Sequence, residues 1–478
     1  NHIKNKFKKI DFSIHSQLES IIRYDGDHNL LLNSNSHIEM SSIAEHSDGI
    51  FKLEFKNRKD KKPMLSPLTI RIMDDYSNSH DINIKFSSLQ NKKTTYKSSM
   101  SFRSLKYVPD SISDEETILS KNSIRLSRFK KSILLNIDYE VGKGKQASKE
   151  KSYIKVPTGM GSYSWIDNNN NGIQELSEFV VSVFQDEAEY VPLFLPSKKL
   201  EDIYIINYHQ RIQVDLKRIL KSKFFEKINL SSELQLNNKN KLKTKIYNPF
   251  FNENIDSSMK YTLQNINSLV YNEFNENLSF QIINKRIINQ NSFSYGSDRQ
   301  ENHENHFKCA LIYFKRIKND ISIKIGKNNH SSSFFSNRNY SYRYHEIINK
   351  LVLLKTSKQE CAVQGEYKLK LPQYDLYDGD SQNMRYIGGS ISYIYSDNKQ
   401  NSIELNNRVI NINFNETNNN ILNYDLMEGL NSGFNVIMGV NYKRQLKNQM
   451  EVHLSYSSRK SQESKFKHIG NVGIQAFF

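Results

Sequence analysis

A twelve-residue stretch from Asp167 to Glu178 carries the side-chain pattern of a single calcium-binding loop. Oxygen-bearing side chains stand at its alternate early positions, a glycine at its sixth position permits a sharp turn, and a glutamate ends it. Calcium prefers six to eight hard oxygen ligands in a flexible shell, and one short loop can supply them. The predicted ligands are Asp167, Asn169, Asn171, the backbone carbonyl of Ile173, Glu175 (directly or through water) and Glu178.

The composition of this loop limits what kind of Ca²⁺ site we expect. Only three of the predicted ligands are carboxylates, and Gln174 stands where an apolar residue is usual. We therefore expect one structural site of modest affinity, suited to calcium-rich extracellular fluid, and not a paired sensor. The alternative is an Asn-rich turn that binds nothing, because an Asn-Gly pair favours tight turns without any metal.

Other candidate residues for chemistry are sparse. His303, His306 and Cys309 are spaced by three, which on a strand places neighbours on opposite faces; we predict instead a polar loop leading into a strand at 307–314. Cys309 and Cys361 are the only cysteines, too few for a disulfide framework, although one bridge stays open. No Ser/His/Asp set, Gly-rich phosphate loop or carboxylate pair is evident, so we predict no catalytic site and a protein that is not an enzyme.

The elements that must position the loop are strands with a period of two residues. Runs of about eight to ten residues place apolar side chains on one face and polar ones on the other, the length that a tilted strand needs to cross a bilayer. Small residues on the polar face, such as Gly388 and Gly439, let strands curve around a lumen. The clearest runs are 204–216, 228–236, 363–371, 387–395, 434–442, 450–456 and 472–478.

These runs predict an all-β fold, a large antiparallel transmembrane β-barrel of about 18 to 24 strands. The final run ends on Phe478, as a barrel does when its last strand closes against its first. We divide the chain into an N-terminal strand region of the same barrel (1–160), the calcium-type loop with a possible mouth or plug segment (161–199) and C-terminal barrel strands (200–478). Leu176 to Leu195 is either a short helix with an extended segment inside the mouth or a long loop, and 109–121 is an acidic linker.

Composition separates this class of protein from others. The hydrophobic content is 37% and the mean hydropathy is −0.67, and no stretch approaches the roughly 20 apolar residues of a spanning helix. A barrel tolerates such values because only alternate residues face lipid. The net charge of +16 is scattered along the chain without a dense basic stripe, which argues against nucleic acid as a partner. Outer-membrane lipid, with other envelope proteins as further candidates, is the predicted partner.

The segment around the loop resembles a known group of sequences. Trp165-Ile166-Asp167, followed by Asn171-Gly172-Ile173-Gln174-Glu175-Leu176 and Glu178-Phe179, is similar to a loop of large Bacteroidota surface proteins of unassigned function. There, Trp-(Ile/Val)-Asp-x-Asn-x-Asn-Gly-(Ile/Val)-x-Glu-Leu-x-Glu-Phe precedes a β-rich region that ends in an aromatic residue. The resemblance covers about residues 155–200. It implies an outer-membrane location in a Gram-negative bacterium and no established activity.

The sequence thus leaves two functions open. The first is a non-enzymatic outer-membrane barrel that acts as a passage or as a component of a transport, secretion or assembly machine. The second is a soluble, extracellular β-rich protein for surface binding or adhesion. The two differ in where the apolar rows lie, because a barrel exposes them and a soluble sandwich buries them between sheets.

Overall fold

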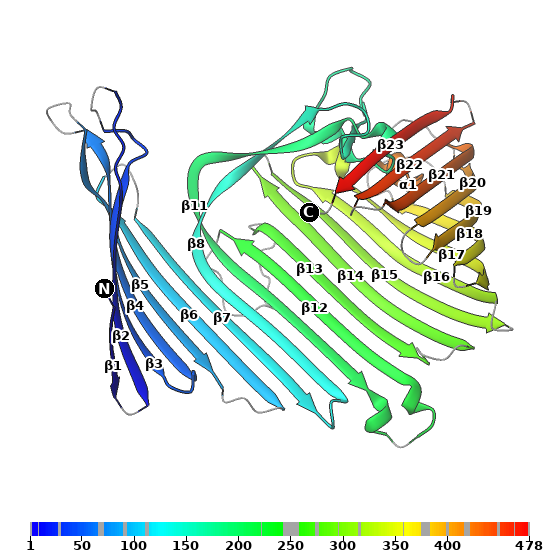
Figure 1. Cartoon of the computed structure of the whole chain (residues 1–478). Coiled ribbons are helices and arrows are strands. Elements are labelled where there is room, and N and C mark those ends of the chain that lie inside the picture. The colour runs from blue at the N-terminus through cyan, green and yellow to red at the C-terminus, as the bar shows by residue number, and fades with distance from the viewer. Residues whose placement is uncertain are drawn as a thin grey trace. The chain divides into compact units, whose positions relative to one another are not determined.

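The computed structural model shows a chain folded almost entirely into β-strands (Figure 1). It describes residues 2–476 except 8, 27–29, 66–70, 89–92, 110–113, 221, 242–257, 273–276, 295, 314–316, 357, 374–382, 398–400, 415–420, 447–449 and 463. Within these residues there are 23 strands and one short α-helix.

The strands of the first part of the chain are β1 (His2–Phe7), β2 (Ile10–Ile21), β3 (Asn35–His46), β4 (Phe51–Leu65), β5 (Arg71–Ser87), β6 (Thr94–Tyr107), β7 (Glu115–Arg128), β8 (Ile133–Lys155), β9 (Tyr163–Trp165), β10 (Phe179–Val181), β11 (Tyr190–Asp215) and β12 (Ile228–Asn240). The remaining strands are β13 (Ser258–Tyr271), β14 (Leu278–Phe293), β15 (Gly296–Tyr313), β16 (Ile317–Ser332), β17 (Tyr340–Thr356), β18 (Gln359–Gln373), β19 (Met384–Asp397), β20 (Asn401–Asn413), β21 (Gly433–Leu446), β22 (Met450–Ser461) and β23 (Lys467–Ala476). The helix is α1 (Ile421–Leu426), and 3-10 turns occur at η1 (Leu176–Glu178), η2 (Gln185–Glu187), η3 (Leu216–Arg218), η4 (Phe225–Lys227) and η6 (Ser336–Arg338).

Strands that follow one another in sequence pair antiparallel. This holds without interruption from β1 to β8 and from β14 to β23. Turn chemistry supports the pattern: between β3 and β4, Gly49 takes a φ of +69° and donates its N–H to the His46 carbonyl at 2.8 Å. The predicted all-β class and large antiparallel architecture are confirmed, and 23 described strands fall within the predicted 18 to 24.

The chain forms two compact units built from interleaved segments. Unit 1 contains residues 1–148, 198–214 and 233–262, and unit 2 contains 149–197, 215–232 and 263–478. The predicted division at residues 160 and 199 stays a prediction. The two units are described separately below.

In unit 2 the strands expose apolar side chains on one face and bury charged ones on the other, the reverse of what a water-soluble protein shows. On β18, Val363 and Tyr367 are 49% and 39% exposed, whereas Lys368, on the opposite face, is 8% exposed. Strand register extends this pattern, because six apolar residues on consecutive strands lie directly opposite one another, each between 38% and 60% exposed. This outer row consists of Ile282, Phe307, Ile323, Ile347, Tyr367 and Ile387.

Unit 1 repeats the pattern with one exception. Phe55, Ile82 and Ile118 belong to one row across β4 to β7 and are 37% to 45% exposed. The exception is the apolar face of β11 and β12, which we expected to be open. There Tyr208 and Leu236 are only 8% and 6% exposed.

Three local expectations are corrected by the strand bounds. Glu115 and Glu116 lie in β7, so the predicted acidic linker at 109–121 is a strand from Glu115 onward. The polar stretch at 327–340 has the composition of a long loop between strands, but it belongs to β16 as far as Ser332. The predicted strand from residue 307 is present, but the polar stretch before it, with His303 and His306, is part of the same strand β15 and not a loop, because its backbone pairs on both sides.

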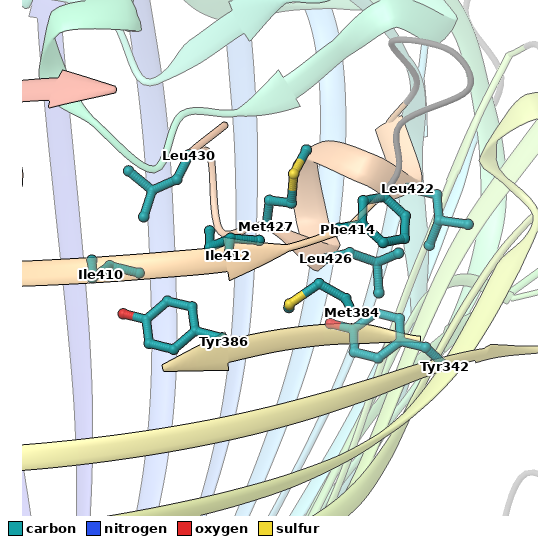
Figure 2. Packing of buried hydrophobic residues seen from close by; sticks show 10 residues of the cluster. All are labelled: Tyr342, Met384, Tyr386, Ile410, Ile412, Phe414, Leu422, Leu426, Met427 and Leu430. Carbon is teal, nitrogen blue, oxygen red and sulfur yellow. The ribbon is translucent and has the colours of Figure 1, made fainter. Parts of the chain in front are cut away.

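The main buried apolar cluster is local and lies beside α1 (Figure 2). Leu422, Leu426, Met427 and Leu430 pack onto the inner faces of strands β17, β19 and β20. The strand residues in the cluster are Tyr342, Met384, Tyr386, Ile410 and Ile412, together with Phe414. Among the described residues, no helix is both long and apolar enough to cross a membrane.

Candidate functional site

The candidate site of unit 2 is the chain between β8 and β11, residues 156–189, here called the inner segment. It contains the short pair β9 and β10, which is antiparallel with Trp165 opposite Phe179, and the turns η1 and η2. The predicted calcium loop connects β9 to η1. At 176–195 the structure has neither the short helix nor the uninterrupted long loop that the sequence left open, but two single 3-10 turns, the strand β10 and the start of β11.

The loop folds around its own amide groups. Asp167 accepts the N–H of Asn171 at 3.2 Å through Oδ1 and that of Gly172 at 2.9 Å through Oδ2. The φ angles of Asn170 (+55°) and Gly172 (+70°) allow the chain to reverse here, as the predicted turn glycine requires. Asn169 Oδ1 accepts the N–H of Asn171 at 3.1 Å. These bonds fix the reversal of the chain within the loop.

Glu178 is the most buried of the predicted ligands. Its residue is 0% exposed, and its carboxylate accepts Trp165 Nε1–H at 2.7 Å and the N–H of Asn168 at 3.1 Å. The Glu175 N–H is a third donor at 3.3 Å. Trp165 therefore contacts the loop that it precedes. Three donors on one buried carboxylate also offset the cost of desolvating its charge.

The structure brings most of the predicted ligands into one network. The side-chain amides of Asn169 and Asn171 both donate to Glu175 Oε1, at 3.4 and 3.3 Å, and the Ile173 N–H donates to Asn171 Oδ1 at 2.7 Å. Among the described residues, however, no group of three or more His, Cys, Asp or Glu side chains is arranged to hold a metal ion. The calcium site therefore stays a prediction.

The single tryptophan provides a direct test of the calcium prediction. If the loop binds Ca²⁺, then Tb³⁺, which takes the same oxygen ligands, will bind close to Trp165, and excitation of the indole will sensitise terbium emission that Ca²⁺ displaces. We expect Asp167→Asn to weaken the signal at least tenfold in terbium affinity, because it removes one of three carboxylates. Glu150→Gln, a carboxylate change outside the loop, is the control. Emission that is absent, or unaffected by Asp167→Asn, would contradict the prediction.

Arg338 anchors one side of the inner segment to the strands. Its side chain is 8% exposed and donates to the carbonyls of Ser177 (2.9 Å) and Phe179, while Nη1 contacts Asp298 Oδ2 at 3.2 Å. A guanidinium has five N–H donors in a planar fork, which lets one residue bind several carbonyls and a carboxylate together. Arg338 thus fixes the turn that carries Glu178.

Arg459 anchors the opposite side. On the polar face of β22, it forms a bidentate pair with Asp186, with Nε 2.8 Å from Oδ1 and Nη2 2.6 Å from Oδ2, and it also contacts Glu187. Its guanidinium lies 4.2 Å from the centroid of the Phe184 ring. Lys467 is a second, more distant cation, 3.6 Å from Asp186. Both acidic residues of η2 are thereby bound to the last two strands.

The α1 region contacts both the inner segment and the strands. Tyr424 OH accepts the Val183 N–H at 3.0 Å and donates to Glu187 at 3.3 Å. Burial raises the pKa of Tyr424 to about 12. After the helix, both carboxylate oxygens of Glu428 accept hydrogen bonds from the Lys368 ammonium group, each at 2.8 Å. Burial opposes its ionisation, but the Lys370 and Lys368 charges outweigh burial and lower the pKa of Glu428 to about 2.

Sequence reasoning found the loop but missed these anchors. Arg338 and Arg459 lie in polar stretches that give no local signal of a partner more than 150 residues away. The other predicted features are not brought together: His303 and His306 are on alternate faces of β15, and His306 bonds Ser322 at 2.7 Å. Cys309 and Cys361 are both free thiols.

Comparison with known proteins gives only distant likeness. No family model and no curated protein matches the chain. Among solved structures, the chain is similar to the copper transporter OprC (7% identity, TM-score 0.38, 98% of this chain and 75% of that chain). It is also similar to the closed form of the ferric-catecholate import receptor Fiu from E. coli K12 (9%, 0.35, 95% and 74%) and to the FrpB iron transporter from Neisseria meningitidis (10%, 0.34, 95% and 74%). Scores this low assign neither a family nor an activity.

Proposed function

We propose that the chain is a non-enzymatic β-barrel of the outer membrane of a Gram-negative bacterium and that it serves as a passage for solutes. The observation that carries this proposal is the outer row of unit 2. Six apolar residues lie in register on six neighbouring strands and are substantially exposed. Since strands lie about 4.8 Å apart, the row extends for roughly 24 Å across the sheet.

Water would make such a row costly, and lipid would make it favourable. Burying each large apolar side chain in an apolar medium contributes about 1.5–3 kcal/mol, so six of them represent a large driving force for insertion. Soluble monomers rarely expose a continuous apolar surface of this extent. The soluble adhesion protein considered above requires these residues to be buried between sheets, which their exposure does not support.

The opposite face supports an aqueous interior. Glu366, 6% exposed, pairs with Arg408 through both carboxylate oxygens at 2.6 and 2.8 Å and accepts the Tyr386 hydroxyl at 3.1 Å. Such groups are stable only where polar partners or water are at hand. The inner segment and α1 lie on this polar face in unit 2, and we assign them the role of narrowing the passage. Outer-membrane lipid is the corresponding partner of the apolar face, and other envelope proteins remain a proposal.

Membrane fractionation and vesicle swelling test this function together. We expect the full-length protein in the outer-membrane fraction, with migration on gels that changes on heating, because closed barrels resist detergent until they are heated. Vesicles that contain the protein should swell faster than empty ones in isotonic arabinose. The Arg385→Met variant, which changes an exposed side chain at the beginning of β19, should behave as wild type.

Two results would count against the proposal. Recovery of the whole protein in the soluble fraction without detergent would exclude the membrane assignment. Swelling no faster than that of empty vesicles, from protein that is inserted and heat-modifiable, would exclude an open passage.

A further inference from the structure

Unit 1 contains a cavity on the polar face of its strands that none of the features above uses. Its volume is about 660 Å³, within the range of pockets that hold small organic ligands. Strands β3 to β8, β11 and β12 contribute to its wall. Four lysines line it: Lys52, Lys85, Lys97 and Lys121.

Strand register places these lysines next to one another. Lys52 on β4 is directly opposite Lys85 on β5. Lys97 on β6 is opposite Ser87, two residues from Lys85, so those two lysines are diagonal neighbours. Lys121 is opposite Ser99, two residues from Lys97, which makes it a diagonal neighbour of Lys97. Directly opposed like charges destabilise a sheet, and diagonal positions are within reach of long side chains.

The carboxylates of the cavity do not compensate all of these charges. Glu45 contacts Lys52 at 3.7 Å, and Glu140 contacts Lys121 at 3.1 Å. Asp138 forms a bidentate pair with Arg125, at 2.9 and 3.0 Å.

Each acid therefore already has a cation. Among the residues that the structure describes, Lys85 and Lys97 form no ion pair or hydrogen bond, and both are exposed to the cavity. The result is a pair of neighbouring cations without a counter-charge.

The rest of the lining suits a polar organic molecule. Serine hydroxyls and side-chain amides lie on the same face of the strands as the lysines. His209 is held by Glu233 at 3.1 Å. The neutral polar lining residues on this face are Ser87, Ser99, Ser123, Asn207, Gln235 and Asn237.

We propose that this cavity binds a soluble anion that carries at least two carboxylate or phosphate groups, bridged by Lys85 and Lys97. The proposal rests on the proposed function only in taking the polar face as the wall of an aqueous passage. It then names the class of solute that this wall selects. An ammonium group makes up to three charge-assisted hydrogen bonds, so two adjacent lysines hold a dianion firmly.

Equilibrium binding to the full-length protein in detergent micelles tests the proposal without requiring transport. The probes are citrate and inorganic pyrophosphate at low ionic strength, measured by calorimetry. We expect saturable one-site binding of at least one probe, and we expect Lys85→Gln with Lys97→Gln to weaken it at least about tenfold. High salt should weaken wild-type binding in the same direction.

The matched control is Lys56→Gln with Lys239→Gln, which removes the same charge outside the cavity, where the lysines bond Glu39 and Gln146. Affinity in this control should stay within about twofold of wild type. Absence of saturable binding of both probes, or equal loss in both double variants, would overturn the proposal. Binding without vesicle swelling would support the anion site and count against the passage, so the two failures are distinguishable.

Discussion

Ile347→Arg is expected to lower the stability of the protein in lipid by about 2–4 kcal/mol, which is the cost of an arginine on the lipid face near the bilayer centre. Ile347 is 47% exposed and lies between Ile323 and Tyr367 in the outer row. Urea titration of the protein refolded into lipid vesicles measures the change, with heat-modified migration as the readout of the folded fraction.

The adjacent residue supplies an unusually close control. Ile348 points to the polar face, where Ser322 and Glu366 are its cross-strand neighbours, so Ile348→Arg is expected to cost less than half as much. A soluble protein would show the reverse order, because there the exposed position tolerates arginine and the half-buried one does not. Equal or reversed costs in vesicles would therefore contradict the membrane assignment.

Arg459→Met is expected to release the inner segment locally by about 3 kcal/mol. The substitution leaves Asp186 and Glu187 half-buried with Lys467 as their remaining cation, and breaking a buried pair typically costs 3–5 kcal/mol. Hydrogen exchange measures the effect at the amides of Ser182 and Ala188, which bond within the segment. Their protection should fall by roughly a hundredfold.

Two controls distinguish a local release of the inner segment from a general loss of stability. Arg385→Met removes an exposed guanidinium from a different strand, β19, and should leave the amides of Ser182 and Ala188 protected. The amides of β16 should keep their protection in Arg459→Met, since those strands pair independently of η2. Unchanged exchange at Ser182, or a uniform loss over all strands, would show that Arg459 does not anchor the segment.

The sequence predicts the strands best where one face is apolar and the other polar. On β18, Val363 and Tyr367 alternate with Glu366 and Lys368, and both the strand and its two faces are confirmed. Period two suffices there because each face meets a single kind of environment.

Prediction fails where the environment of a face changes along a strand. On β20, Val409 and Ile410 are adjacent and both apolar, because one is exposed outside and the other is covered by α1. On β15, polar residues from Gln300 to His306 occupy both faces, so no alternation marks the strand. The covering helix follows from contacts distant in sequence, which no local period encodes.

The calcium-type loop shows the same limit within the candidate site. Its turn and the contact of Trp165 with Glu178 follow from residues within one short window, and the structure contains both. Its attachment through Arg338 does not, because a lone arginine in a polar stretch is compatible with any partner. Local geometry is thus predictable from sequence, and docking is not.

The separation of Arg459 from Asp186 by 273 positions has a kinetic consequence. Every hairpin from β14 to β23 closes between sequence neighbours, which is entropically cheap and fast, whereas this tether must wait until the penultimate strand exists. The inner segment is therefore expected to be among the last parts of unit 2 to reach its final position during folding. A chain truncated before β22 would retain most of its hairpins but would lack the Arg459 contact that holds the inner segment.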